Sequence, residues 1–170
     1  MILGEKSYSM VKKIVNIWSS GGVIVHKKND ITYVAICNRK SENLFCLPKG
    51  RPEKNEDYIK TAIREVKEET GITTKIIKKI STTTHYFGVT DSEQKTVKIS
   101  QSNPESNNNH ITIYKKTVHW YLMKYLSGDF SMHDDEFDSV KWIEINRAIN
   151  KISYKNEKDV LGKVLAIFKK

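Results

Sequence analysis

Three glutamates, Glu65, Glu68 and Glu69, have a spacing that could place their carboxylates together. They stand at i, i+3 and i+4, and residues at these offsets lie on one face of a helix. Like charges at this spacing repel one another, so a helix alone gains nothing from the arrangement. A divalent cation among the carboxylates would remove the repulsion, and hard oxygen ligands suit Mg²⁺ or Mn²⁺. A metal site is one interpretation of this pattern, and a polar surface face is the other.

One amphipathic helix must carry these carboxylates. Its predicted buried stripe has the spacing i, i+3, i+4 and i+7, and it consists of Ile59, Ala62, Ile63 and Val66. Asp57 is well placed as the N-cap, Asn55 can take a left-handed conformation just before it, and Thr70-Gly71 supplies the C-terminal stop. Glu56 precedes the helix and is near enough in sequence to reach Arg64 and hold its side chain.

The stretch from Gly50 to Ile72, GRPEKNEDYIKTAIREVKEETGI, contains all of these residues. Its spacing resembles the signature of the Nudix hydrolases, and every defined position of that 23-residue motif is matched. A pattern of this length is far more specific than a three- or four-residue motif. The resemblance implies an α/β/α sandwich in which helices flank a mixed β-sheet. It also implies hydrolysis of a nucleoside diphosphate linked to another moiety.

The resemblance assigns a role to each residue of the motif. A divalent metal would be bound by carboxylates and a backbone carbonyl, from Glu65, Glu68, Glu69 and Lys49 or Gly50. Water would attack a phosphorus in line, and Glu65 or Glu68 would bring nucleophile and metal together. Arg64 would orient the motif through Glu56. The general base is sought in the loop before the last strand, which contains Asp134, Asp135 and Glu136. Glu136 is chosen by its spacing from Trp142, and an ordinary acidic loop is the alternative.

Three further segments narrow the substrate class. LPKGRPEKNED, KKTVHWYLM and DEFDSVKWIEINRA resemble diadenosine tetraphosphate hydrolases, which implies asymmetric cleavage of the tetraphosphate into ATP and AMP. Tyr86 or Phe87 would stack an adenine, although an aromatic residue in a strand can equally belong to the core. Lys49, Arg39 and Lys116 would contact phosphates, or they are plain surface charge.

The sequence departs from this subfamily at two places that concern how the pocket would recognise the base. Asn55 stands where the subfamily often has glycine, and the polar stretch from Val89 to Asn109 is longer than its usual counterpart. The alternatives are other Nudix pyrophosphatases. They would act on oxidised nucleoside triphosphates, diphosphoinositol polyphosphates or RNA 5′ ends.

Length and composition limit the class of protein. The chain of 170 residues suits one domain, 1–170, with 1–15 as a possible N-terminal extension. The net charge of +9 fits a polyanionic small-molecule substrate or nucleotide bias in the genome, and basic residues without an interleaved aromatic platform argue against nucleic acid. No apolar run approaches the length of a membrane span, and the N-terminus lacks the apolar core of a signal peptide, so no membrane partner and a cytoplasmic location are expected. Cys37 and Cys46 are expected to be buried, reduced thiols. The sequence specifies no oligomeric state.

The remaining elements follow from local patterns. Strands are expected at 17–26, 31–38, 44–47, 73–80, 82–87, 111–126 and 139–145. In the strand at 111–126, both faces are expected to be covered. A short hairpin around Thr96–Ser100 could lie inside the polar stretch. Asn146 would cap a short helix from Arg147, and Asn156–Lys170 would form an amphipathic helix whose core stripe consists of Val160, Val164, Leu165 and Phe168.

Overall fold

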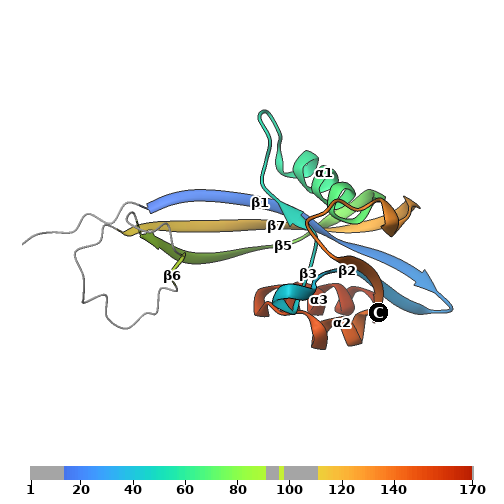
Figure 1. The fold of residues 1–170 in the computed structure, drawn as a ribbon. Coiled ribbons are helices and arrows are strands. Elements are labelled where there is room, and N and C mark those ends of the chain that lie inside the picture. The colour runs from blue at the N-terminus through green and yellow to red at the C-terminus, as the bar shows by residue number, and fades with distance from the viewer. Residues whose placement is uncertain (1–13, 91–95, 98–110, 170) are drawn as a thin grey trace, which may run out of the picture. The chain divides into compact units, whose positions relative to one another are not determined.

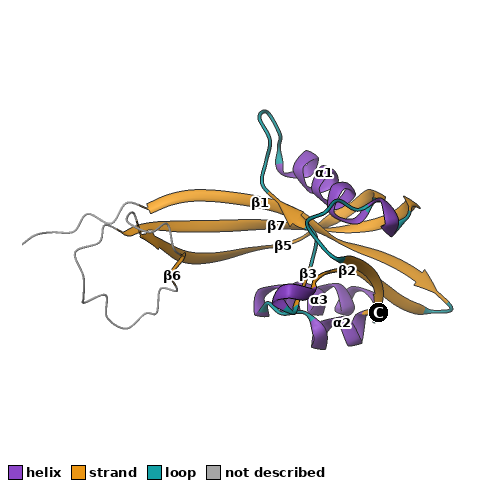
Figure 2. Ribbon diagram, viewed as in Figure 1, coloured by secondary structure: helices purple, strands orange, loops and turns teal. Residues whose placement is uncertain are grey.

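The structure is a computed structural model that describes residues 14–90, 96–97 and 111–169 (Figures 1 and 2). The strands are β1 (Ile14–Lys28), β2 (Ile31–Arg39), β3 (Leu44–Cys46), β4 (Lys49–Gly50), β5 (Ile72–Thr90), β6 (Thr96–Val97), β7 (Ile111–Gly128) and β8 (Ser139–Glu144). The helices are α1 (Tyr58–Thr70), α2 (Ile145–Lys151) and α3 (Lys155–Phe168), with short 3₁₀ turns η1 (Lys40–Glu42) and η2 (Phe130–Met132).

The chain divides into two compact units, each described by itself. The first unit comprises Met1–Ile17 and Thr84–Lys116, and the second comprises Trp18–Thr83 and Thr117–Lys170. That the whole chain forms one domain stays a prediction. Residues 1–13 of the predicted N-terminal extension lie outside the described residues, as does most of the polar stretch.

One eight-stranded sheet has the order β3-β2-β1-β7-β5-β6, with β4 paired to β1 and β8 paired to β2. In the second unit, β2 pairs antiparallel with β1, β3 and β8. Val34 therefore lies between Val25 of β1 and Ile143 of β8. The antiparallel pairing of β4 with β1 sets Gly50 opposite Ser20.

Alternation along the strands of the second unit produces two hydrophobic clusters, one on each face of the sheet. Val118, Trp120 and Leu122 of β7 join a cluster with buried residues of α2 and α3, whereas Tyr121 and Met123 join a cluster with Ala62 and Val66 of α1. The prediction that both faces of this strand are covered is therefore confirmed. Figure 1 shows α1 on one side of the strands and α2 and α3 on the other. The predicted α/β/α sandwich is confirmed.

Several predicted boundaries were wrong. The strands expected at 73–80 and 82–87 form one strand, β5, in which Thr83 accepts a hydrogen bond from Nε1 of the buried Trp120 (3.0 Å). Helix α2 begins at Ile145 after an N-cap at Glu144, so Asn146 does not cap it. The side chain of Ile145, the first residue of this helix, is buried in the core. Phe168, the last residue of α3, is exposed. Leu161, in the middle of this helix, is buried and was not part of the predicted stripe.

In the first unit, β6 pairs antiparallel with β5, and Val97 lies opposite Gly88. Thr96–Val97 thus pair with β5, and residues 98–100 of the hairpin expected around Thr96–Ser100 lie outside the described part of the chain. The ring of Phe87 stacks with Tyr114 at 5.3 Å between centroids.

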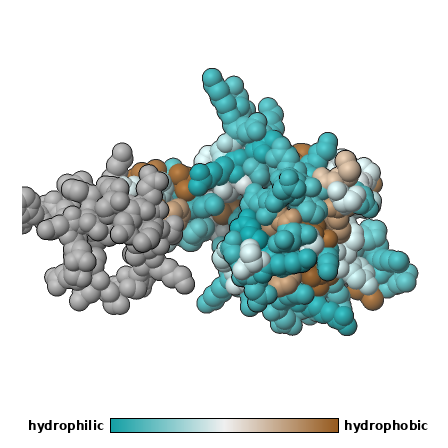
Figure 3. Space-filling model, in the orientation of Figure 1, coloured by the Kyte–Doolittle hydropathy of each residue, from teal (hydrophilic) through white to brown (hydrophobic). Residues whose placement is uncertain are grey.

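Cys37 and Cys46 are both buried and free, and they lie opposite each other on β2 and β3. Burial raises the pKa of Cys46 to about 12 and that of Cys37 well above its usual value, so both thiols stay protonated at neutral pH. Among the described residues, no helix has the length and apolar character needed to cross a membrane. Figure 3 shows that the visible face of the second unit is mostly hydrophilic.

Candidate active site

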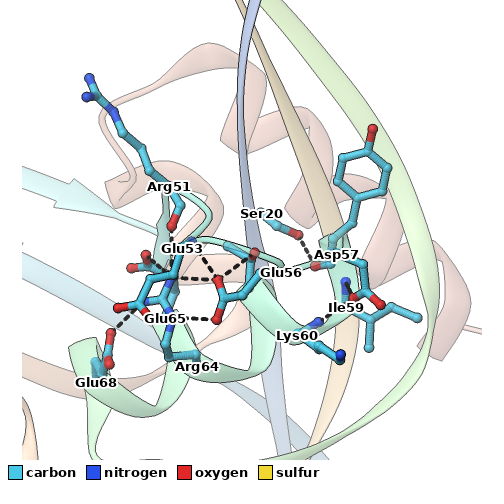
Figure 4. Close-up of polar contacts among 12 residues, drawn as sticks. Ser20, Arg51, Glu53, Glu56, Asp57, Ile59, Lys60, Arg64, Glu65 and Glu68 are labelled. Carbon is cyan, nitrogen blue, oxygen red and sulfur yellow. Dashed lines mark hydrogen bonds and ion pairs between the residues drawn. The ribbon is translucent and has the colours of Figure 1, made fainter.

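Helix α1 begins and ends as its sequence predicts. The Asp57 carboxylate accepts hydrogen bonds from the backbone N–H groups of Ile59 (3.0 Å) and Lys60 (2.8 Å), which satisfies two free donors of the first turn (Figure 4). Gly71 takes a left-handed conformation (φ +71°) and donates its N–H to the carbonyl of Lys67. Both ends of the helix that carries the carboxylates are therefore fixed.

The buried face of α1 differs from the predicted stripe. Ala62 and Val66 are buried as expected, but Ile59 and Ile63 are 49% and 39% exposed. The buried side chains are Thr61, Ala62, Val66, Glu69 and Thr70. The face packed against the protein therefore includes Glu69, and hydrophobic periodicity could not reveal it because the buried residue is charged. Relative to the prediction, the helix is turned about its axis so that Glu69 faces the protein interior.

Glu65 lies directly against the backbone of β4. A Cβ atom added at Gly50 would overlap the carboxylate of Glu65, so only glycine leaves room for it. The pKa of Glu65 is raised, chiefly by burial, although Arg64 works in the opposite direction. The structure thus brings together the carboxylate and the backbone segment that were expected to share a metal.

Glu69 is almost fully buried, with 2% of its surface exposed. Its Oε2 accepts a hydrogen bond from the backbone N–H of Lys49 (2.8 Å). Burial raises the pKa of Glu69 to about 9, and the charges of Glu136 and Glu65 act in the same direction. Glu65, Glu69 and Glu136 are therefore close enough to influence one another electrostatically.

The guanidinium of Arg64 holds four acceptor groups together (Figure 4). Nε and Nη2 donate to the two oxygens of Glu56 (2.8 and 3.0 Å), and Nη2 also donates to the carbonyl of Arg51 (2.8 Å). Nη1 pairs with Oε2 of Glu68 (2.7 Å), and Nη2 lies 3.0 Å from Oε1 of Glu65. The predicted contact of Glu56 with Arg64 is present. The additional ion pairs of Arg64 with Glu65 and Glu68 were not predicted.

Glu56 is held on several sides. Besides Arg64, it accepts hydrogen bonds from the backbone N–H of Glu53 and from the hydroxyl of Thr61, both at 2.9 Å. Arg64 and then Glu53 lower the pKa of Glu56 to about 2. Glu56 is therefore a fixed anion that orients Arg64.

The loop before β8 is tied to the end of α1. The backbone N–H of Asp134 donates to the carbonyl of Glu68 (2.9 Å), and the N–H of Glu136 donates to Oδ1 of Asp134 (3.0 Å). The charge of Glu136 acts on both Glu65 and Glu69, so this loop brings Glu136 toward the carboxylates of the helix. Arg39 pairs with Glu136 (3.1 Å) and with Glu42 (3.0 Å).

Lys49 has a partner that sequence reasoning missed. Its ammonium lies 3.6 Å from Oε1 of Glu157 in α3, and Oε2 of Glu157 accepts the backbone N–H of Leu47 (2.8 Å). Glu157 is 1% exposed. A signal was present, because Glu157 precedes Val160, Leu161 and Val164 by three, four and seven residues. A carboxylate at a position of a buried stripe indicates a specific partner.

Two other predicted substrate contacts, Tyr86 and Lys116, belong to the first unit of the chain. Tyr86 lies in β5 and is exposed, and Lys116 lies in β7. Their roles in stacking a base and binding phosphate stay predictions.

The carboxylates of α1 are gathered but not arranged as a finished metal site. Within the described residues, no three His, Cys, Asp or Glu side chains already meet in a way that could hold an ion. Arg64 neutralises part of the charge of Glu65 and Glu68 instead. The donors nevertheless fit a hard divalent cation because they are oxygens, and the absent Cβ of Gly50 lets the Glu65 carboxylate reach the backbone of β4.

Three features together indicate the class of protein. They are Gly50 of β4 against Glu65, the capped helix α1 with its glutamates, and Glu56 bound by Arg64. A sequence model of the NUDIX domain matches residues 15–164 of the chain. The chain therefore belongs to the NUDIX family, whose members hydrolyse nucleotides and generally use divalent metal ions.

Two curated relatives show which members the sequence is similar to. A Mycobacterium tuberculosis protein that bears the name mutator protein MutT4 is 30% identical over 152 residues, which cover 86% of this chain and 53% of the relative. An 8-oxo-(d)GTP phosphatase of Mycolicibacterium smegmatis is 27% identical over 128 residues, which cover 75% of this chain and 32% of the relative. The chain thus spans about half or less of the length of these relatives.

Solved structures share the fold. A binary complex of the C. elegans Ap4A hydrolase superposes with a TM-score of 0.60 at 23% identity, covering 90% of this chain and 98% of that one. A NUDIX hydrolase from Nitrosomonas europaea gives 0.61 at 16% identity, covering 89% and 90%. At these identities the likeness concerns the fold alone.

Proposed function

We propose that this chain hydrolyses a phosphoanhydride bond of a nucleoside polyphosphate with the help of Mg²⁺ or Mn²⁺. The observation that carries this proposal is the position of the Glu65 carboxylate against the backbone of Gly50. Glu136 is close enough to raise the pKa values of both Glu65 and Glu69. Burial and the neighbouring carboxylates disfavour the charged form of these groups, and a cation bound among them would reverse that preference.

Each residue would have a distinct part in the reaction. Glu65, Glu68, Glu69 and the carbonyl of Gly50 would hold the ion, which would neutralise phosphate charge and activate water. Arg64 contacts Oε1 of Glu65 and Oε2 of Glu68, so the other oxygen of each carboxylate is the one that would face a cation. Glu136 would accept the proton of the attacking water as the bond between phosphorus and the leaving oxygen breaks.

Two substrate classes have support. The name of one curated relative, an 8-oxo-(d)GTP phosphatase, slightly favours a nucleoside triphosphate, such as an oxidised guanine nucleotide. The resemblance of LPKGRPEKNED, KKTVHWYLM and DEFDSVKWIEINRA to diadenosine tetraphosphate hydrolases supports the dinucleotide, which we keep as the second candidate. For this second class, Tyr86 would stack an adenine, and Lys49 and Lys116 would contact phosphates.

A substrate panel tests the proposal and separates the two classes. The purified chain would be incubated with Mg²⁺ or with EDTA, and with 8-oxo-dGTP, dGTP, diadenosine tetraphosphate, a diphosphoinositol polyphosphate or a 5′-triphosphorylated RNA. We expect metal-dependent products, measured by anion-exchange chromatography, with faster turnover of 8-oxo-dGTP than of the dinucleotide. The reverse order would assign the chain to the second class, and no product from any compound would refute the function.

The metal ligands are tested by Glu68→Gln. This side chain is exposed, so we expect an unchanged melting temperature and a loss of kcat of about 100-fold or more, as for removal of one charge-stabilising group. Asp159→Asn on the exposed face of α3 removes the same charge and should keep native activity. Native activity in Glu68→Gln would remove this residue from the metal site.

A further inference from the structure

Arg39, at the end of β2, contacts Glu136 at two places. Nε donates to the backbone carbonyl of Glu136 (3.3 Å), and Nη2 donates to its Oε1 (3.1 Å). The two contacts fix both the main chain and the carboxylate of one residue. A planar guanidinium can do this because its donors point in fixed directions.

Arg39 is itself fixed before it reaches Glu136. Nη1 pairs with Oε1 of Glu42 at 3.0 Å, and the guanidinium lies 5.3 Å from the centroid of the Phe137 ring. An arginine held by a carboxylate and an aromatic ring has already lost much of its side-chain freedom. It therefore presents its remaining donors in a defined direction.

The backbone around these side chains is joined as well. The N–H of Lys40 donates to Oδ2 of Asp138 (2.7 Å), and the N–H of Asp138 donates to the carbonyl of Asn38 (2.9 Å). On its other side, the loop is bound to α1 through Asp134 and the carbonyl of Glu68. Glu136 thus lies in a short loop held between the end of β2 and the end of α1.

The side chain of Glu136 nevertheless needs a partner of its own. It is 53% exposed, and an exposed glutamate populates several rotamers. Arg39 binds Oε1, so Oε2 is the atom left to face the reaction. A proton acceptor must stay within hydrogen-bond reach of the attacking water, and this contact supplies the necessary restraint.

We propose that Arg39 is a positioning residue that holds Glu136 in its working orientation, and that this is its role in place of a direct contact with substrate phosphate. The inference rests on the proposed function, in which Glu136 is the proton acceptor. Removal of a partner that orients a site residue typically costs 10–100-fold in activity, whereas loss of a phosphate contact chiefly weakens substrate binding.

A double-mutant cycle separates these two roles. Arg39→Gln, Glu136→Gln and the double variant would be compared for kcat and KM, with Mg²⁺ and with the panel substrate that the native chain hydrolyses fastest. We expect Arg39→Gln to lower kcat by about 10-fold or more with little change in KM. In the Glu136→Gln background, we expect the same substitution to leave kcat unchanged, because nothing remains to be positioned.

A conservative variant and a charge control complete the experiment. Arg39→Lys keeps the charge but not the fork, so its kcat should stay nearer to that of Arg39→Gln, whereas a phosphate contact would largely tolerate lysine. Lys27→Gln removes the same charge from the exposed Lys27–Asp30 pair (3.1 Å) in the turn after β1, and it should match the native chain. Circular dichroism melts would show that all variants fold.

Three results would overturn the inference. They are a rise in KM without loss of kcat in Arg39→Gln, equal effects of Arg39→Gln in both backgrounds, and native kcat in Glu136→Gln. Failure of the proposed function looks different, because the native chain would then hydrolyse none of the nucleotides tested.

Discussion

At the scale of single residues, Glu69 is a proposed metal ligand whose burial makes its charged form unfavourable in the metal-free fold. It is buried, it lies near Glu65 and Glu136, and its pKa is raised from 4.5 to about 9, first by burial. A raised pKa means that the folded state favours the neutral carboxyl. The stabilising contribution of the protonated group is complete below about pH 4.5 and is lost as the pH rises toward 9.

Glu69→Gln should therefore stabilise the metal-free protein at neutral and alkaline pH. The amide oxygen can still accept the N–H of Lys49, and the amide, unlike the carboxylate, can be buried without first taking up a proton. We expect a gain of about 1–3 kcal/mol in the free energy of unfolding at pH 7 that vanishes near pH 4.5, on the scale of 1.36 kcal/mol per pKa unit. Urea melts at several pH values with EDTA would measure it. A variant less stable than the native chain at pH 8 would contradict this account.

Residue contacts of the site were predictable only where the partners are close in sequence. Arg64 and Glu56 are eight residues apart on a capped helix and its lead-in, and their contact could be anticipated. Arg39 and Glu136 are 97 residues apart, one at the end of β2 and the other in the loop before β8. Their meeting depends on the pairing of β2 with β8, which local patterns do not specify.

At the scale of elements, the packing of α1 on β4 decides where the carboxylates lie. Because Gly50 has no Cβ, the Glu65 side chain can lie against the strand. The sequence predicted the helix, its cap and its end, since these depend on neighbouring residues. It misplaced the buried face, because Ile59 and Ile63 have the right spacing but face outward while the charged Glu69 faces inward.

Gly50→Ala tests this packing. The added methyl group would displace the Glu65 carboxylate, and a shift of about 1 Å in a site group can cost about 100-fold in rate. We therefore expect kcat to fall by about 10–100-fold while the chain still folds. Gly162→Ala in α3 is a matched control: nothing lies within 4 Å of its added Cβ, so activity should stay native and stability should rise by about 0.5–1 kcal/mol. Equal activity in the two variants would exclude the predicted displacement.

Helix α3 contacts Lys49 of strand β4 through Glu157, from the face of the sheet opposite α1. Glu157→Leu would leave the N–H of Leu47 without its acceptor and the Lys49 ammonium without its partner. We expect a loss of about 3 kcal/mol in stability, whereas Glu157→Gln, which still accepts the N–H, should lose about 1–2 kcal/mol. Chemical denaturation of both variants would measure the difference. Equal losses would show that hydrophobic packing at this position matters more than the polar contacts.

At the scale of the whole molecule, a chain with a net charge of +9 concentrates negative charge at one place. A net positive charge would favour the approach of the proposed polyanionic substrate. The acidic cluster would repel that substrate until a cation occupies it. In the proposed function, metal binding, substrate approach and folding would therefore be coupled through the protonation of the same carboxylates.

This coupling predicts that stabilisation by Mg²⁺ depends on pH. Glu69 is protonated below about pH 9, so a cation that binds there must displace its proton, and affinity should rise with pH up to that value. A ligand at 100 times its Kd stabilises by about 2.7 kcal/mol, so the rise in melting temperature caused by a fixed Mg²⁺ concentration should be larger at pH 8.5 than at pH 6. Glu69→Gln has no such proton to lose and should flatten this dependence. If the native chain gives equal shifts at both pH values while Mg²⁺ still supports hydrolysis, the ion binds without Glu69, and the metal site would then consist of Glu65, Glu68 and the backbone of Gly50.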